Sequence, residues 1–230
     1  MIRLPWLNRR PTDPVAAAYV AGTPVKVGSK TPLHPLRFVV VDAETTGFDF
    51  SRDRILSLAA IPVEAGVIQL RTLRSWLVYH SDAPMTEAVR VHGILPADAR
   101  TGEPEARVLR ELLPMITGAI LVGHHIGFDI GMLNAALDRH FGVRVRNPSV
   151  DTAQLAMRAV EAFRKTGYPG QRAPSLEELC THLDLQPLER HTAEGDTFTT
   201  ADLFMLLCAK YARQMGRPLT AGDLPLVRNS

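Results

Sequence analysis

"VVVDAETTGFDF", residues 39–50, is the stretch on which the prediction of the fold depends. An apolar run leads straight into Asp42 and Glu44, and a single alanine separates the two acids. Because side chains alternate between the two faces of a β-strand, both carboxylates project from the same face, with Cβ atoms about 6–7 Å apart. The stretch therefore predicts a buried strand that ends with two negative charges side by side.

Two carboxylates at this spacing repel each other unless a cation lies between them or one keeps its proton through a raised pKa. A hard divalent cation such as Mg²⁺ removes the conflict, because it usually binds through one or two carboxylates together with phosphate oxygens of a substrate. Thr45, Thr46 and Gly47 add hydroxyl groups, amides and a flexible backbone beside the pair. The alternative is a strand end that simply becomes exposed to solvent, and the pair alone does not decide between the two.

The composition is that of an ordinary globular protein with one domain and some additional chain. Of the 230 residues, 46% are hydrophobic and 22% are charged. No apolar run approaches the roughly 18 residues needed to cross a bilayer, and the N-terminus lacks the apolar core of a secretory signal. Cys180 and Cys208 lie in apolar, helix-like segments, as is typical of core residues in a reduced protein. We therefore expect a cytoplasmic protein with no membrane contact.

Residues 1–36 differ from the remainder of the chain in proline content and in charge. They hold six prolines, and their five cations stand against the single acid Asp13. We expect an extension that leans on the domain, with a short helix at residues 14–22. Such a basic arm fits a polyanionic partner and fits a solvated tail equally well. The predicted organisation is an extension at 1–36, a folded domain at 37–212 and a tail at 213–230.

The hydrophobic pattern changes along the chain from hairpins to alternating strands and helices. Residues 53–80 indicate two strands joined by a hairpin at residues 64–66, which continue the first strand as an antiparallel meander. The later alternation adds parallel strands, so the prediction is an α/β fold with a mixed five-stranded sheet and helices on both faces. The expected strands lie within residues 36–44, 53–80, 118–125 and 149–151, and the expected helices within 85–93, 104–117, 128–141, 152–163, 175–185 and 191–215.

Two later segments repeat the arrangement of an acid beside the end of a strand or the start of a helix. Asp129 follows the strand at 118–125 near the beginning of its helix. His191 precedes the last long helix, and Asp196 follows five residues later. Each of these is also typical of a first-turn acid or a capping residue, which the helix dipole favours by about 0.3–1 kcal/mol. Their order and spacing together form a specific signal.

The chain resembles the DEDD superfamily of 3′–5′ exonucleases in its His-containing branch, and more narrowly it is similar to the proofreading epsilon subunits of bacterial DNA polymerase III. The first motif of the family, Asp-x-Glu-Thr-Thr-Gly, stands at residues 42–47. The second, Gly-His-Asn-x-x-Phe-Asp, stands at 123–129 with His125 in place of the asparagine, and the third, His-x-Ala-x-x-Asp, stands at 191–196. The match extends from residue 37 to about residue 212.

The resemblance implies a ribonuclease H-like fold and the release of nucleoside monophosphates from the 3′ end of DNA by two-metal hydrolysis. Two Mg²⁺ or Mn²⁺ ions would neutralise the acids and clamp the phosphate. Asp42 would bridge both ions, Glu44 and Asp196 would hold the ion that carries the attacking water, and Asp129 would act through metal-bound water. His191 would be the general base, since the ordinary pKa of histidine near 6.5 suits that role at neutral pH.

The same resemblance places the terminal nucleotide against Thr45, Thr46 and the backbone at Gly47. Phe128 is either a base contact or a core residue, and His92 is either close to the substrate pocket or only the end of a helix. The expected partner is a single-stranded 3′ end, with DNA favoured over RNA, and a polymerase is a candidate protein partner.

Two other functions stay open from the sequence alone. An RNA-trimming 3′–5′ exoribonuclease would share the fold and the acids, because contacts to the 2′-hydroxyl are not visible in a sequence. A non-catalytic nucleic-acid-binding subunit would have the fold without turnover, although the presence of all five catalytic positions is unfavourable to this alternative.

Overall fold

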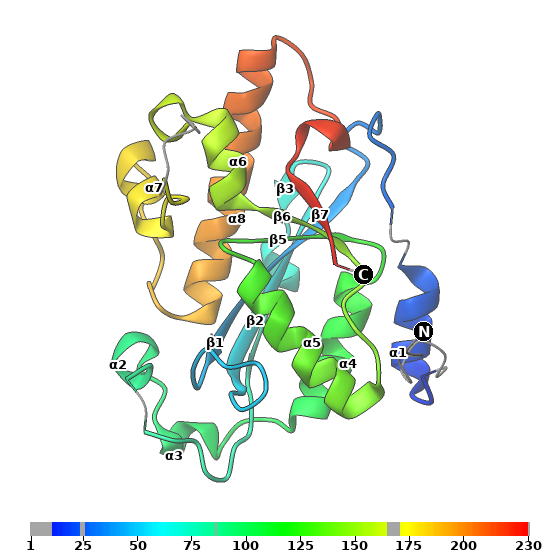
Figure 1. The fold of residues 1–230 in the computed structure, drawn as a ribbon, viewed down its shortest axis with the longest axis vertical. Helices are drawn as coiled ribbons and strands as arrows, with labels where there is room; N and C mark the ends of the chain where they lie inside the picture. The colour runs from blue at the N-terminus through cyan, green and yellow to red at the C-terminus, as the bar shows by residue number, and fades with distance from the viewer. Residues whose placement is uncertain (1–10, 24–25, 86, 165–170, 230) are drawn as a thin grey trace.

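Strand β1 (Arg37–Thr45), which carries the two acids, lies in the middle of the sheet (Figure 1). On one side β2 (Ile55–Glu64) pairs with it antiparallel along almost its whole length. On the other side β5 (Ile120–Gly123) pairs with it in parallel. The hairpin and the crossover expected from the hydrophobic pattern are thus both present. The computed structural model describes residues 11–23, 26–85, 87–164 and 171–229.

The sheet contains seven strands rather than the expected five, in the order β3-β2-β1-β5-β6-β7, with β4 also paired to β2. The expected third strand is broken into β3 (Val67–Ile68) and β4 (Arg74–Leu77) by a 3₁₀ turn at Leu70–Thr72. Val67 and Leu70 are each 58% exposed. An edge strand that buries so few of its apolar side chains is not held straight by packing. The apolar residues in the sequence did not show that they would be exposed.

The seventh strand comes from the segment that the sequence analysis placed in the tail. β7 (Leu226–Arg228) pairs antiparallel with β6 (Pro148–Asp151) at the edge of the sheet. Beyond it, the amide of Asn229 donates to the carbonyl of Asn147 at 2.9 Å. A strand of three residues is too short to show an alternation of apolar and polar residues in the sequence. Only its pairing with the edge of the sheet defines it.

Alternate residues of β1 enter two separate cores, because both faces of the sheet are covered by helices. Val39 and Val41 pack with the apolar sides of α4 and α5, whereas Phe38 and Val40 pack against α6 and α8. The expected mixed sheet with helices on both faces is confirmed (Figure 1). The helices are α1 (Pro14–Gly22), α2 (Val89–His92), α3 (Pro96–Ala99), α4 (Glu105–Ile116), α5 (Gly127–Phe141), α6 (Thr152–Ala159), α7 (Leu176–Leu183) and α8 (Ala193–Met215), with short 3₁₀ turns at Glu161–Phe163 and Ala221–Asp223.

Several helix ends follow the sequence closely, and one expected helix is shorter. Ser175 and Glu178 form a capping box at the start of α7. The helix expected over 85–93 is reduced to one turn, Val89–His92, which Gly93 ends in the left-handed region. Among the described residues, no helix combines the length and apolar character needed to span a membrane.

Helix α1 is tied to the domain by a buried hydrogen-bond network. The hydroxyl of Tyr19 donates to Oδ1 of Asn147 at 2.6 Å and accepts the backbone N–H of Arg146 at 2.7 Å. Nδ2 of Asn147 donates in turn to the carbonyls of Ile116 and Ala119. The network joins α1 to the end of α4 and the start of β6. Residues 1–10, with three of the five cations of the expected arm, lie outside the described residues.

Replacing Tyr19 by phenylalanine tests this attachment. The variant Tyr19→Phe leaves a buried backbone N–H and a buried amide oxygen without their partner, and each unsatisfied group costs about 1–3 kcal/mol. We expect the free energy of unfolding in urea to fall by about 2 kcal/mol. The control Tyr79→Phe alters a side chain that is 47% exposed and should change stability little. Equal stability of the two variants would contradict a structural role for the network.

Candidate active site

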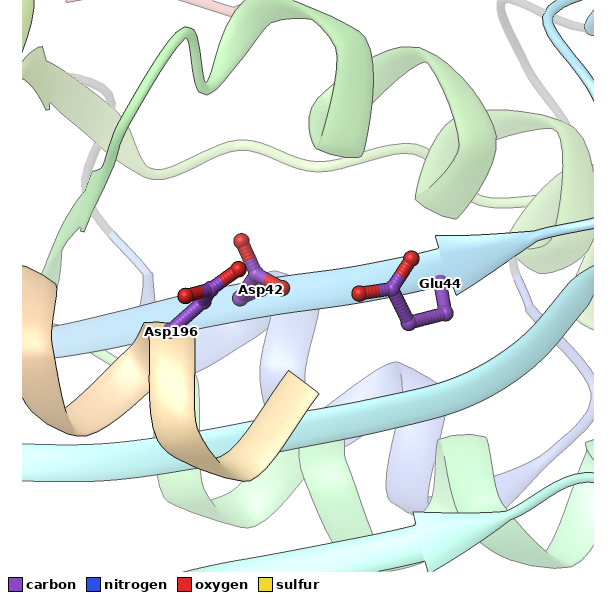
Figure 2. A group of neighbouring side chains, drawn as sticks. All are labelled: Asp42, Glu44 and Asp196. Carbon is purple, nitrogen blue, oxygen red and sulfur yellow. The ribbon is translucent and has the colours of Figure 1, made fainter. Parts of the chain in front are cut away.

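Three carboxylates meet at the end of β1. Asp42 and Glu44 project from the same side of the strand, and Asp196 faces them from the first turn of α8 (Figure 2). One oxygen of each lies within 4.8 Å of an oxygen of the others. Residues that are 152 positions apart in the sequence therefore form one acidic cluster, and two of the three are on a single strand.

Asp129 lies beside this cluster and is attached to its strand. It is buried in the first turn of α5, and its Oδ1 accepts the backbone N–H of Ala43 at 3.1 Å. Ala43 separates Asp42 from Glu44, so the fourth acid is held against the middle of the pair. It is not among the three carboxylates whose oxygens lie within 4.8 Å of one another.

Burial raises the pKa of all four acids, and the charge of neighbouring acids raises it further for Asp42, Glu44 and Asp129. Burial raises the pKa of Asp42 well above its ordinary value, and the charges of its acidic neighbours raise it further. Burial and the charge of Asp196 raise the pKa of Glu44 to about 7, and burial raises that of Asp129 to about 8. Burial also raises the pKa of Asp196. Near neutral pH the cluster must hold protons or bind a cation.

Arg190 supplies a compensating positive charge that the sequence analysis did not identify. Its Nη1 donates to Oδ1 of Asp196. The same guanidinium lowers the pKa of Asp42 and Glu44 against the effect of burial. The available signal was a cation directly before His191, but a sequence does not show which way that side chain points.

The turn that carries His191 has a strained backbone. Glu189 and His191 both have positive φ, at 35° and 63°, a region that non-glycine residues seldom adopt. The N–H of His191 donates to Oδ2 of Asp196 at 3.2 Å, so this exposed residue lies beside the cluster. Arg190 and His191 also line a cavity of about 520 Å³ beside α7. Strain of this kind persists only where the surroundings impose it.

Gly195 is the residue that lets this turn lie so close to α8. A Cβ at this position would come closer to the backbone carbonyls of Leu188 and Glu189 than real Cβ atoms ever do. The N-cap Thr192 accepts the N–H of Gly195 at 3.0 Å, which fixes the first turn of the helix. The positions of Arg190 and His191 relative to Asp196 therefore depend on the absence of a Cβ at residue 195.

The turn after β1 is held by its own side chains. Oγ1 of Thr45 donates to the carbonyl of Gly47 at 2.8 Å, and Oγ1 of Thr46 donates to Asp53 at 2.7 Å. Asp53 also accepts the N–H of Asp49 at 2.8 Å. Both hydroxyl groups that the sequence suggested for the substrate are thus engaged in the turn. The groups that remain for a ligand in this turn are therefore mainly backbone groups in a fixed position.

His92 and Phe128 both lie next to this turn. The ring of His92 is buried, its Nδ1 accepts the N–H of Ile94 at 3.0 Å, and burial lowers its pKa while a hydrogen bond to the backbone of Thr45 opposes that shift. Phe128 is half-buried against the core and contacts Phe48, with ring centroids 5.5 Å apart. Both therefore combine a packing role with a place next to the acids.

The two histidines of the second motif have different environments. His124 is partly buried, its Nδ1 lies 2.9 Å from Oγ1 of Thr152, and burial lowers its pKa to about 3. His125 is exposed with φ at 55°, and its N–H donates to Asp151 at 3.1 Å. Asparagine and histidine both adopt the left-handed region more readily than most residues. The backbone conformation thus explains why His125 can replace the usual asparagine.

Comparison with known proteins gives consistent similarities. The family model described as Exonuclease (RNase T) matches residues 39–204. DNA polymerase III subunit epsilon of Aquifex aeolicus is 32% identical over 169 residues, which are 73% of this chain and 78% of that protein. The PolC-type DNA polymerase III of Halalkalibacterium halodurans is 31% identical over 75% of this chain, but the match spans only 11% of that protein.

Solved structures show the same fold. Escherichia coli exonuclease I in complex with a dT13 oligonucleotide superimposes with a TM-score of 0.64 and 22% identity, over 79% of this chain and 43% of that one. The ribonuclease H-like architecture expected from the sequence is thereby confirmed. The chain spans less than half the length of this structural relative.

Replacing Gly195 by alanine should displace the turn at residues 187–191. Because a shift of about 1 Å in a catalytic group can cost about a hundredfold in rate, we expect Gly195→Ala to lower metal-dependent hydrolysis of a labelled single strand by about that factor. The control Gly127→Ala lies in the first turn of α5, where an added Cβ meets nothing within 4 Å. Equal activity of the two variants, both with native circular dichroism, would exclude this role for Gly195.

The raised carboxyl pKa values predict a pH dependence of stability in the metal-free protein. The folded protein holds a proton on Glu44 up to about pH 7, whereas the unfolded chain releases it near 4.5. Stability should therefore fall as the pH rises from about 4.5 through 7. Urea denaturation in EDTA at several pH values should show a weaker fall in Glu44→Gln. All other ionisable groups are common to both proteins, so their contributions largely cancel in the difference, and parallel curves would contradict the assignment.

Proposed function

We propose that this chain, which belongs to the exonuclease family, is a metal-dependent 3′–5′ exonuclease that releases nucleoside monophosphates from the end of a DNA strand. The observation that carries the proposal is the cluster of Asp42, Glu44 and Asp196, whose oxygens lie within 4.8 Å of one another. Such a concentration of buried negative charge is unfavourable for the fold, and it is explained by binding of cations.

The donor set fits a hard divalent cation. All three clustered ligands are carboxylate oxygens, which Mg²⁺ and Mn²⁺ prefer, and their raised pKa values reflect charge that a cation would neutralise. We propose two ions, held by Asp42, Glu44 and Asp196, with Asp129 as the fourth acid. When bound, the ions would supply Lewis-acid stabilisation of the phosphate and of the oxygens that enter and leave.

His191 is proposed as the general base. It would take a proton from the attacking water at a ring nitrogen, a role worth about 10²–10⁴-fold in rate. The hydrogen bond from its backbone N–H to Asp196 keeps this residue beside the acids. The strained turn and the close contact at Gly195 hold it there, which is the pre-organisation that such a step requires.

The terminal nucleotide is proposed to lie against the turn of Thr45, Thr46 and Gly47. Because both threonine hydroxyls bind within the turn, the backbone makes these contacts, and the hydroxyls keep it in shape. Phe128 would contact the base, and His92 would support the turn through its interaction with the backbone of Thr45.

A single-stranded DNA end is the proposed substrate, and a polymerase subunit is the proposed protein partner. Support comes from the name of the Aquifex relative, a subunit of DNA polymerase III, and from the oligonucleotide bound to exonuclease I. The proposal includes a cytoplasmic location and the division into an extension at 1–36, an exonuclease domain at 37–212 and a tail at 213–230.

Replacing Asp42 tests the mechanism. We expect Asp42→Asn to lower Mg²⁺-dependent hydrolysis of a 3′-labelled single strand by at least about a thousandfold, because the acid at the centre of the cluster is lost. His191→Gln should cost about 10²–10⁴-fold, because the proposed proton acceptor is lost. The control Asp202→Asn removes an exposed acid two turns further along α8 and should leave the rate unchanged. Near-normal activity of Asp42→Asn would exclude the mechanism.

A panel of substrates separates the remaining functions. Matched DNA and RNA oligonucleotides, with Mg²⁺ and with Mn²⁺, should be hydrolysed from the 3′ end with a preference for DNA. A preference for RNA would assign the chain to RNA trimming instead. Tight binding of single strands without turnover in either metal would assign a non-catalytic role.

A further inference from the structure

Arg190 is, among the described residues, the only lysine or arginine that forms an ion pair with the acidic cluster. We infer that it is a built-in counter-ion that exchanges with a divalent cation. Its guanidinium binds Asp196 in the metal-free protein and turns into the cavity beside α7 when the cluster binds an ion. This inference rests on the proposed function, because it concerns the ions proposed there.

Both oxygens of Asp196 are engaged by the turn that precedes α8. Nη1 of Arg190 donates to Oδ1, and Oδ2 accepts the backbone N–H of His191 at 3.2 Å. The charge of the guanidinium also reaches Asp42 and Glu44, the other members of the cluster. A divalent cation held by the three carboxylates would lie beside this guanidinium, and two positive charges at short range repel each other. The arginine and an ion therefore compete for the same negative charge.

The contact between Arg190 and Asp196 can be exchanged without unfolding. The arginine side chain is 25% exposed and the aspartate side chain is 11% exposed, so the pair lies at the border of the solvent. An arginine keeps its charge at any ordinary pH, so the contact is not released by loss of a proton. A partly exposed ion pair also contributes little net stability. Competition by another cation is thus the way in which this contact is broken.

The cavity of about 520 Å³ beside α7 offers a second position for the guanidinium. Arg190 itself lines this cavity, and so do Glu177 and Asp184. Both acids are exposed, and within the described part of the chain neither carboxylate has a hydrogen bond or an ion pair. The cavity therefore supplies both space and negative charge for a guanidinium that leaves Asp196.

The backbone around Arg190 favours movement of the side chain alone. Glu189 and His191, on either side of it, both have positive φ. The carbonyls of Leu188 and Glu189 lie against Gly195, and the N–H of His191 is bound to Asp196. The exchange therefore redirects the arginine and leaves the proposed general base beside the acids.

The affinity for an ion tests the competition. In calorimetric titrations with Mn²⁺, we expect Arg190→Gln to bind the ion about tenfold more tightly than the wild-type chain, because the competing charge is removed. The control Arg213→Gln removes an exposed arginine near the end of α8 and should leave the affinity unchanged. Unchanged or weaker binding in Arg190→Gln would overturn the inference, since an arginine that only orients Asp196 would assist the ion.

The cavity has its own readout in a double-mutant cycle. Glu177→Gln combined with Asp184→Asn removes the acceptors for the displaced guanidinium, so it should weaken Mn²⁺ binding by about threefold in the wild-type background. The same pair of changes should have no effect in the Arg190→Gln background. Equal effects in both backgrounds would reveal only a general loss of negative charge and would overturn the exchange.

Nuclear magnetic resonance follows the side chain in the wild-type protein. The Nε–H signal of Arg190, assigned by its loss in Arg190→Gln, should shift on addition of Mg²⁺, whereas that of Arg213 should not. A signal of Arg190 that stays unchanged at saturating Mg²⁺ would contradict the exchange. If the wild-type chain binds ions and hydrolyses DNA but Arg190→Gln binds Mn²⁺ no more tightly, this inference alone fails. If ion binding depends on Arg190 as expected but no strand is hydrolysed, the proposed function alone fails.

Discussion

The crowding of negative charge at the end of β1 is the constraint on which the rest of the structure depends. Asp42 and Glu44 share one face of a central strand, so their separation is fixed by the strand itself. The two other acids come from the first turns of α5 and α8, where the helix dipole favours a negative charge. A sheet with both faces covered holds these elements rigidly, and the repulsion is therefore kept and not relaxed. The fold itself therefore holds the acids in an arrangement that a divalent cation would neutralise.

The surroundings of the acids show how this arrangement is maintained. Arg190 offsets part of the charge, and the N–H groups of Ala43 and His191 donate to Asp129 and Asp196. Two left-handed residues and a glycine without space for a side chain place the His191 turn against α8. On the other side, Thr45, Thr46 and Asp53 bind one another and stiffen the turn after β1. Polar groups near the site thus serve mainly to hold backbone in position.

Much of the fold and of the candidate site could be predicted from the sequence, because both depend on the periodicity of apolar residues and on the spacing of the motif residues. The apolar run before Asp42 predicted β1, the two-residue spacing of Asp42 and Glu44 predicted their shared face, and the three motifs predicted the family. What the sequence could not show were directions and contacts across the chain. The direction of Arg190 depends on a strained turn, and the contact of Phe50 with Gly131 joins residues 81 positions apart. The break at Leu70–Thr72 and strand β7 both depend on the edges of the sheet. They could therefore not be predicted before the arrangement of the sheet was known.

Segments near both described ends of the chain converge on the same residue, Asn147. Tyr19 donates to the amide oxygen of Asn147, and Asn229 donates to its carbonyl. The segments at 29–33 and 219–222 are also joined by backbone hydrogen bonds, among them that from Ala221 to Thr31. A domain whose first and last segments are adjacent can be inserted into a longer polypeptide without disrupting its sheet. This architecture suits a domain whose match spans only 11% of a much longer protein, the PolC-type DNA polymerase III of Halalkalibacterium halodurans.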